Sequence, residues 1–472
     1  MTQVDILDTL EPPTRQWTIS AYLWFLAALA TVSLPFLLVG TVARRPMLGV
    51  LPLAIGVFGL TLVKPEGGVL LLLLLAPMED VLSVIPGTLT VVRVLGVLVV
   101  LSFGVHAMMG KRVILNDPYV RRHGLLVLVM FVSILLSRYP LLGMINMQTQ
   151  LAFLAFTVLA LSLIEDDRMV DNAVVFLFLG CLTGAALGLA GEMTGHRSLT
   201  QERLTIGEGS NPNTFSRAIG PGLLLLPYMF WRFRATLVRA VIVACSLTIA
   251  AAVVKTQARG VWVSLALAVP ASFWFATANL ASRTIRTVGI VVAALVVLVI
   301  GLQVGLIGTD IVQRYQSIEQ GVEAGGRAQI WRVCVAAFLE HPVFGMGMQI
   351  FGYDSMEVAF RHGLPLPKGV SRDPHSSYFA VLADLGLVGI LASAAMLLNM
   401  LRGLIRLERT PLRGAAMGLF FFLLLSSISG TSLNRKYFWM PMAVMAAIIA
   451  VRRRTLSQSD LTGLEGDNAQ AN

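Results

Sequence analysis

The sequence predicts an all-α polytopic membrane protein with about 12–14 transmembrane helices and one long outward loop that contains short helices. Of its 472 residues, 56% are hydrophobic and only 13% are charged. The mean hydropathy of +0.78 is spread over the whole length. Soluble proteins carry about twice this charged fraction, and a single anchor needs only about 20 apolar residues. These values exclude a soluble enzyme, with or without one anchor.

The candidate spans are apolar runs bounded by charges, prolines or glycines. In chain order they cover residues 20–40, 47–63, 67–78, 88–109, 123–138, 146–164, 170–190, 213–231, 237–255, 259–278, 286–308, 376–401, 412–430 and 437–451. The run at 67–78 is too short to cross about 30 Å of hydrocarbon as a helix. We expect it to form a bent hairpin with 47–63 across the Lys64-Pro65-Glu66 turn.

The distribution of arginines predicts the orientation of the spans. Arginine-rich connections lie at 110–122, 232–239, 279–286, 402–413 and 452–454. The positive-inside rule places all five on the cytoplasmic side, and this is consistent if every span crosses once. The stretches 191–212, 255–259 and 309–375 then face outward. Arg44 and Arg45 disagree with this count, which makes the first spans its weakest part.

The net charge of +10 is explained by this topology, so we expect no nucleic-acid partner. Cys181 and Cys245 lie in apolar spans and Cys334 lies in a polar loop. This spacing indicates neither a disulfide nor a metal site. The sequence also lacks GxxxxGKS, HExxH and GxSxG motifs, so ATP hydrolysis, zinc proteolysis and an elbow-serine esterase have no support.

The outward stretch 309–375 is too long for a simple linker. Within it, helical spacing predicts a short amphipathic helix on the membrane surface, with Arg327 near its start and Trp331, Cys334, Val335 and Phe338 following. The chain is therefore expected to have four parts: an N-terminal transmembrane bundle at 1–308, the loop at 309–375, C-terminal transmembrane helices at 376–451, and a disordered cytoplasmic tail at 452–472.

Two arginines and one histidine are predicted on the same outer face. Arg259 opens a span, Arg327 follows Gly325-Gly326, and His375 precedes a span in Asp373-Pro374-His375. Each alone fits a snorkelling or capping residue. Together they suit a phosphate leaving group and an alcohol acceptor, because arginine forks bind phosphate oxygens and histidine accepts protons near neutral pH.

Three further residues are candidates for substrate binding on this face. Arg203 precedes the Asn-Pro-Asn turn at 211–213, and Asn213 is the last residue of that turn, which is also an ordinary turn with a helix cap. Tyr378 follows His375 by three positions. The glycines at 345, 347 and 352 permit close backbone approach or a simple turn.

Four motifs in order resemble the O-antigen ligase and Wzy-type polymerase family. They are Arg-Gly-x-Trp at 259–262, Gly-Arg-x-x-x-Trp at 326–331, His-Pro-x-x-Gly-x-Gly at 341–347, and Pro-His-Ser-x-Tyr leading into Leu-Gly-Leu-x-Gly at 374–389. The motifs cover roughly residues 200–400. The chain departs from the family at Ser376, where members often have asparagine, and His341 is expected to be structural.

The resemblance implies a glycosyltransferase of the GT-C type in the bacterial inner membrane, with a periplasmic active site. Its donor would be a glycan on undecaprenyl diphosphate, and its acceptor a glycan or lipid A-core. Arg259 and Arg327 would hold the diphosphate, and His375 would activate the acceptor hydroxyl, with net inversion and without metal or other cofactor. Membrane lipids and other components of a polysaccharide assembly system are the expected partners.

Two products of this chemistry remain open. A polymerase would join O-antigen or exopolysaccharide repeat units, and a ligase would move finished glycan onto lipid A-core. Ser376 and the extra N-terminal spans favour the polymerase. A membrane solute transporter is the alternative from another class, but it would be expected to bury charges in mid-span. Here the clearest charge within a span is Arg93, which lies near a span start.

Overall fold

The computed structural model describes residues 18–31, 47–79, 82–85, 89–193, 203–206, 211–289, 322–365 and 373–470, except the single positions 26, 30, 278, 280 and 283. Long apolar helices dominate these ranges and confirm the predicted all-α membrane fold. A small antiparallel pair, β1 (Ser83–Ile85) with β2 (Leu89–Thr90), is the only sheet within them.

The helices follow the predicted apolar runs closely. The first half contains α2 (Met47–Val63), α3 (Pro65–Leu75), the 3-10 turn η1 (Ala76–Met78), α4 (Val91–Met108), α5 (Pro118–Leu135), α6 (Pro140–Leu163) and α7 (Asp167–Met193). The second half contains α11 (Thr236–Lys255), α12 (Arg259–Phe275), α15 (Val322–Glu340), α16 (Phe351–Arg361), α17 (Ser377–Arg406), α18 (Pro411–Ile428) and α19 (Lys436–Gln470).

Seven helices within the described ranges are long and apolar enough to cross a membrane, namely α4, α5, α6, α7, α11, α17 and α18. Shorter apolar helices include α12 and the pair α3 and η1, which packs against α2 as the predicted bent hairpin. The predicted spans 20–40 and 286–308 reach into residues outside the described ranges. The total of 12–14 spans therefore stays a prediction.

The span predicted at 213–231 is not one helix. It consists of α8 (Pro212–Ile219), α9 (Pro221–Leu224) and α10 (Leu226–Arg232). Pro221 and Pro227 lie at the starts of α9 and α10, where a missing N–H is tolerated but a continuing helix would lose hydrogen bonds. The break leaves Arg217 of α8 inside the protein, with 4% of its surface exposed.

The segments predicted to share one side of the membrane contact one another. Among the segments predicted to face outward, the N–H of Leu204 donates to the main-chain oxygen of Lys255 across 3.1 Å. Among those predicted to face the cytoplasm, Lys111 pairs with Glu66 at 2.6 Å, and Arg452 pairs with Asp167 at 3.1 Å. These contacts agree with the predicted grouping of the segments, and the side that faces the cytoplasm stays a prediction.

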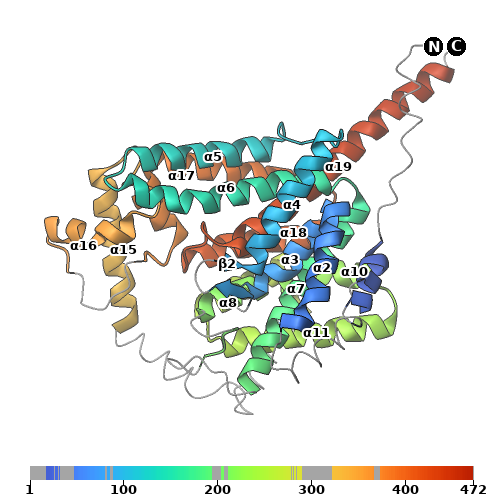
Figure 1. Cartoon of the computed structure of the whole chain (residues 1–472), viewed down its shortest axis with the longest axis horizontal. Coiled ribbons are helices and arrows are strands. Elements are labelled where there is room, and N and C mark those ends of the chain that lie inside the picture. Colours follow the sequence, from blue (N-terminus) through green and yellow to red (C-terminus); the bar gives the residue numbers. More distant parts are fainter. Residues whose placement is uncertain are drawn as a thin grey trace.

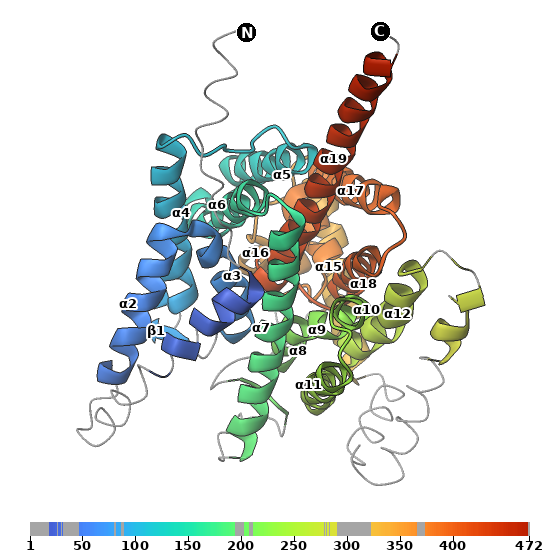
Figure 2. The same cartoon turned by 90° about the vertical axis from the view of Figure 1, so that its right-hand side faces the viewer.

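Helices α5, α6 and α17 run alongside one another, and α15 crosses them at one end (Figure 1). Elsewhere in the bundle, helix α12 packs against helix α18 (Figure 2). Gly414 and Gly418 of α18 face Ser272 of α12, and these small residues allow the two backbones to approach closely. This pair brings the start of α12 next to the end of α18.

Helix α17 is interrupted at Gly386, which has a φ of 62°. The segment 342–347, which carries the Gly-x-Gly motif, occupies the interruption. The N–H groups of Met346 and Gly347 donate to the main-chain oxygens of Ala383 and Asp384, and the N–H of Leu387 donates to that of Pro342. Two motifs that are about 40 residues apart thus complete each other's backbone hydrogen bonds.

The predicted amphipathic helix exists as α15, but its apolar face has a protein partner instead of the expected lipid surface. Ile330, Val333 and Cys334 are buried with Phe351 of α16 and Ala383 of α17. The prediction of a helix is therefore confirmed. The predicted apolar face is only partly right, because Cys334 is buried but Val335 is exposed. At the other end of the chain, α19 continues to Gln470, past residue 451, where we expected a disordered tail to begin. The division into four parts stays a prediction.

Candidate functional site

His375 lies in the loop that leads into α17 and has a left-handed backbone conformation, with a φ of 49°. Its N–H donates to Oδ1 of Asp373 across 2.9 Å, and the same oxygen accepts a hydrogen bond from the Thr431 hydroxyl. On the other side, Nε1 of Trp331 donates to the main-chain oxygen of Pro374 across 2.9 Å. The loop is thus held from both sides, and these contacts compensate for the unfavourable φ.

Arg327 is an exposed residue on α15, one turn before Trp331. The Trp331 ring stacks on Phe379 of α17, with ring centroids 4.7 Å apart. This contact fixes the Arg327 end of α15 beside the start of α17. The positive charge of Arg327 lowers the pKa of the His375 imidazole.

Arg259 is the first residue of α12 and is half-buried. The preceding turn is tight, because Gln257 has a φ of 51° and its main-chain oxygen accepts from the N–H of Arg259 across 3.1 Å. The next residue, Gly260, packs so closely on Ser429 that any side chain would overlap the serine hydroxyl. The position of Arg259 therefore depends on the residues that follow α18.

Arg217 is a site residue that the sequence interpretation missed. Its Nη2 donates to the main-chain oxygen of Ser429 across 2.7 Å and to its hydroxyl across 3.1 Å, and Nη1 donates to the oxygen of Asn213 across 3.2 Å. Its charge acts on His375. A charge inside a predicted span was the available signal, because such residues are costly in a membrane and tend to be functional.

Arg203 and Asn213 contact each other, as Nη2 of Arg203 donates to Oδ1 of Asn213 across 2.9 Å. Nε of Arg203 also donates to the main-chain oxygen of Thr256 across 2.8 Å, which joins the segment before α8 to the turn before Arg259. The main-chain oxygen of Asn213 also accepts a hydrogen bond from Arg217, so Arg203, Asn213 and Arg217 form one hydrogen-bond network.

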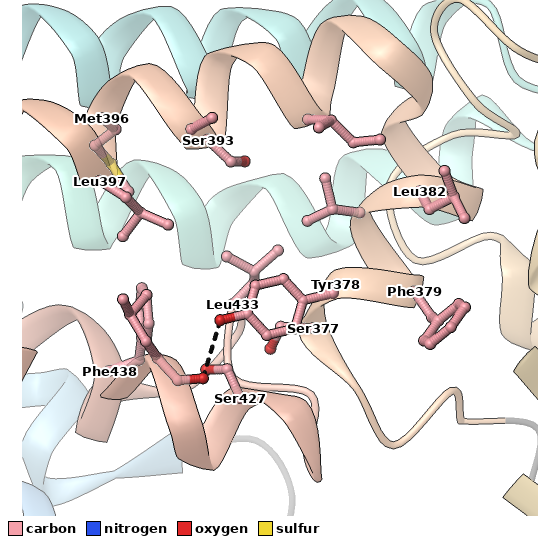
Figure 3. Close-up of a pocket in the computed structure, with 14 residues that line it drawn as sticks. Ser377, Tyr378, Phe379, Leu382, Ser393, Met396, Leu397, Ser427, Leu433 and Phe438 are labelled. Atoms are coloured by element: carbon pink, nitrogen blue, oxygen red, sulfur yellow. Dashed lines mark hydrogen bonds between the residues drawn. The ribbon is translucent and has the colours of Figure 1, made fainter. Parts of the chain in front are cut away.

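Tyr378 points away from this network. Its hydroxyl donates to the main-chain oxygen of Leu424 across 3.0 Å, and its ring lines a cavity of about 370 Å³ between α17, α18 and α19 (Figure 3). The lining is almost entirely apolar and includes Leu397 and Phe438, together with Ser377. The cavity therefore begins two residues from His375 and is suited to a hydrocarbon chain.

The electrostatic surroundings of His375 favour its neutral form. Partial burial lowers the pKa of the imidazole most, and the cations Arg327 and Arg217 lower it further. The carboxylate of Asp373 opposes these effects and raises the pKa. The result is a net lowering of the pKa, so the imidazole is available as a proton acceptor at neutral pH.

The structure thus brings four of the residues predicted from the sequence together as two pairs. Arg203 is hydrogen-bonded to Asn213, the charge of Arg327 acts on His375, and Arg217 connects the pairs. Arg259 is connected to them through Ser429 and Arg217. Tyr378 belongs to the neighbouring cavity. Among the described residues, no group of three or more His, Cys, Asp or Glu side chains could hold a metal ion.

Comparison with known proteins adds one finding to this geometry. Residues 244–394 match the family described as O-antigen ligase, a range that includes Arg259, Arg327 and His375. No curated protein matches the chain. This part of the chain is therefore similar to an O-antigen ligase domain, as the sequence motifs predicted.

Proposed function

We propose that this protein transfers a saccharide from undecaprenyl diphosphate to a sugar hydroxyl at the periplasmic face of a bacterial inner membrane. Two observations carry the proposal. The His375 loop is hydrogen-bonded to α15, which carries Arg327, and the charges of Arg327 and Arg217 act on His375. An apolar cavity lined by Ser377 and Tyr378 begins two residues after His375 in the chain. A ligand that carries a diphosphate on a long hydrocarbon chain matches both halves of this site.

In the proposed reaction, Nδ1 or Nε2 of His375 accepts the proton of the acceptor hydroxyl as its oxygen attacks the anomeric carbon. The bond between that carbon and the diphosphate oxygen breaks on the opposite face, so the configuration inverts. Negative charge develops on the departing diphosphate. The guanidinium groups of Arg259 and Arg327 bind its oxygens.

This mechanism assigns charge neutralisation to arginines and therefore needs no metal ion or nucleotide. The diphosphate is already an activated leaving group. The cavity beside Tyr378 would hold the first part of the isoprenoid chain, because burying each CH₂ group contributes about 0.8 kcal/mol.

We favour polymerisation of O-antigen or exopolysaccharide repeat units, in which the growing chain is transferred to the next lipid-linked unit. Transfer of finished glycan to lipid A-core is the second candidate, and the description of the matched family favours it. Both reactions use the same base and the same leaving group.

The test is incubation of purified protein with the lipid-linked repeat unit alone, in EDTA, followed by separation of the products by size. A ladder of longer chains supports polymerisation. No product until lipid A-core is added supports ligation. No transfer under either condition, or a strict requirement for a metal, would contradict the proposed chemistry.

A further inference from the structure

The connection between α18 and α19, residues 429–435, contacts Arg217, the start of α12, the start of α17 and the loop that holds His375. We name it the α18–α19 turn. Ser429 accepts both hydrogen bonds from Nη2 of Arg217 and packs against Gly260, the residue after Arg259. Gly430 lies under the Arg217 guanidinium, where a Cβ atom would overlap it. The first two residues of the turn therefore fix one arginine directly and a second through its neighbour.

The middle of the turn holds the start of α17. The N–H and the hydroxyl of Ser377 both donate to the main-chain oxygen of Gly430, across 3.1 Å and 3.0 Å. The N–H of Ser432 returns a hydrogen bond to the Ser377 hydroxyl across 2.8 Å. All three residues are buried, so water does not compete for these bonds.

Thr431 extends this connection to the proposed base. Its hydroxyl donates to Oδ1 of Asp373, the oxygen that also accepts from the N–H of His375. His375 therefore lies between two attachments to the same turn, one through Asp373 and one through Ser377. Its left-handed backbone requires such support, because an isolated histidine seldom adopts a φ of 49°.

The far end of the turn is anchored in the helix bundle. Nε2 of Gln150 on α6 donates to the oxygen of Leu433 across 3.0 Å and to Oδ1 of Asn434 across 2.5 Å. Nε1 of Trp439 donates to the same Leu433 oxygen across 2.6 Å. Gln150 and Trp439 are fully buried, so the turn is rigidly connected to the membrane-embedded helices.

We propose that the α18–α19 turn is the positioning element of the site, in which Thr431 orients His375 through Asp373, and Arg217 fixes the turn against the start of α12. Thr431 and Arg217 are positioning residues, since each acts through another group. The turn lies outside residues 244–394, and nothing in the sequence motifs singles it out. The inference rests on the proposed function, because it assigns the effect to the proton-accepting histidine.

The two residues have separate expected effects. Loss of the Thr431 hydroxyl releases Asp373 and leaves His375 misoriented, so kcat falls while KM for the donor changes little. Loss of the Arg217 charge removes a cation near His375. The charged groups that act on His375 are Asp373 in its own loop, Arg327 on α15 and Arg217 on α8. Without Arg217 the pKa of His375 rises, and the acid limb of the pH–rate profile moves to higher pH.

The experiment compares Thr431→Val with Thr431→Ser in the full-length purified protein, using the lipid-linked repeat unit as substrate. Valine is nearly isosteric with threonine, whereas serine retains the hydroxyl. The inference predicts a kcat lower by about 10–100-fold for Thr431→Val and recovery to within about threefold for Thr431→Ser. It is overturned if Thr431→Val retains wild-type kcat, or if the serine variant loses as much activity as the valine variant.

A second pair of variants reports on charge and does not depend on the fold of the threonine variants. Arg217→Gln should move the acid limb to higher pH. Asp373→Asn, whose amide oxygen can still accept both hydrogen bonds, should move it to lower pH. If the acid limb of the pH–rate profile stays at the wild-type pH in both variants, the inference is overturned. His375→Ala distinguishes failure of the inference from failure of the proposed function. If His375→Ala is inactive while the other variants behave as wild type, only the inference fails. If His375→Ala is active, the proposed function fails.

Discussion

Arg217 donates through Nη2 to the main-chain oxygen of Ser429 across 2.7 Å, although 212 positions separate the two residues in the chain. This hydrogen bond joins the broken helical segment α8 to the end of α18. It places a buried cation at the point where the start of α12, the loop before α17 and the α18–α19 turn meet. The site is therefore assembled from distant segments, and its chemistry can be tested residue by residue.

The pH dependence of transfer should follow the neutral form of His375. Burial and two nearby arginines lower the pKa of the imidazole, so the base is deprotonated at pH 7. The rate should be constant near neutral pH and fall only below the ordinary histidine pKa of about 6.5. Initial rates between about pH 5 and about pH 9 measure this limb. A midpoint above the ordinary value would contradict the assignment of His375 as the base.

Arg327→Ala should reduce kcat by about 100–1000-fold, because it removes a cation from the developing diphosphate charge. Arg327→Lys should be intermediate, since lysine keeps the charge but loses the bidentate fork. Arg332→Ala is the matched control, because Arg332 is also exposed on α15. Equal losses from Arg327→Ala and Arg332→Ala, measured with the same donor, would show that the effect is not specific to the site.

Filling the cavity beside Tyr378 should weaken binding of a long-chain donor. Ser393→Leu places a larger side chain in the lining, and displacing several CH₂ groups should raise KM by about tenfold or more (Figure 3). Ala395→Leu, on the exposed side of the same helix, serves as the control. Donors with full-length and short prenyl chains are compared. If Ser393→Leu affects both donors equally, the cavity does not hold the chain.

Gly345→Ala should destabilise the folded protein by more than about 1 kcal/mol. Gly345 has a φ of 68°, and a Cβ atom there would overlap the backbone of Asp384 and Leu385, which cannot move aside. Gly104→Ala, on α4 with open space around it, should be neutral or slightly stabilising. Thermal unfolding in detergent compares the two. Equal melting temperatures would mean that the interruption of α17 does not require this glycine.

The fold was largely predictable from the sequence because membrane spans have a strong local signal. A run such as 47–63 must be helical in lipid, and it forms α2 with the same bounds. Prediction failed at 213–231, where hydropathy suggested one span and Pro221 and Pro227 divide it into α8, α9 and α10. The proline signal was present, but the apolar average outweighed it.

The site was predictable only where residues form motifs. Arg259, Arg327 and His375 were found because their neighbours resemble a family. Arg203 and Asn213 were candidates because they lie at or before one turn, but the hydrogen bond between them was not predicted. Arg217 and Thr431 were missed, because a single charge in an apolar run and a short polar connection have ordinary explanations. Their importance comes from hydrogen bonds to distant residues, and no local pattern records such contacts.

The most direct test of the proposed site is the transfer rate of purified Arg259→Ala, Arg327→Ala and His375→Ala variants on an undecaprenyl-diphosphate-linked repeat unit. Protein level in the membrane and thermal stability are measured in parallel. We predict that each variant is present and folded but loses transfer by at least about 100-fold. Wild-type rates in all three variants would contradict the proposal that these residues bind the diphosphate and activate the acceptor.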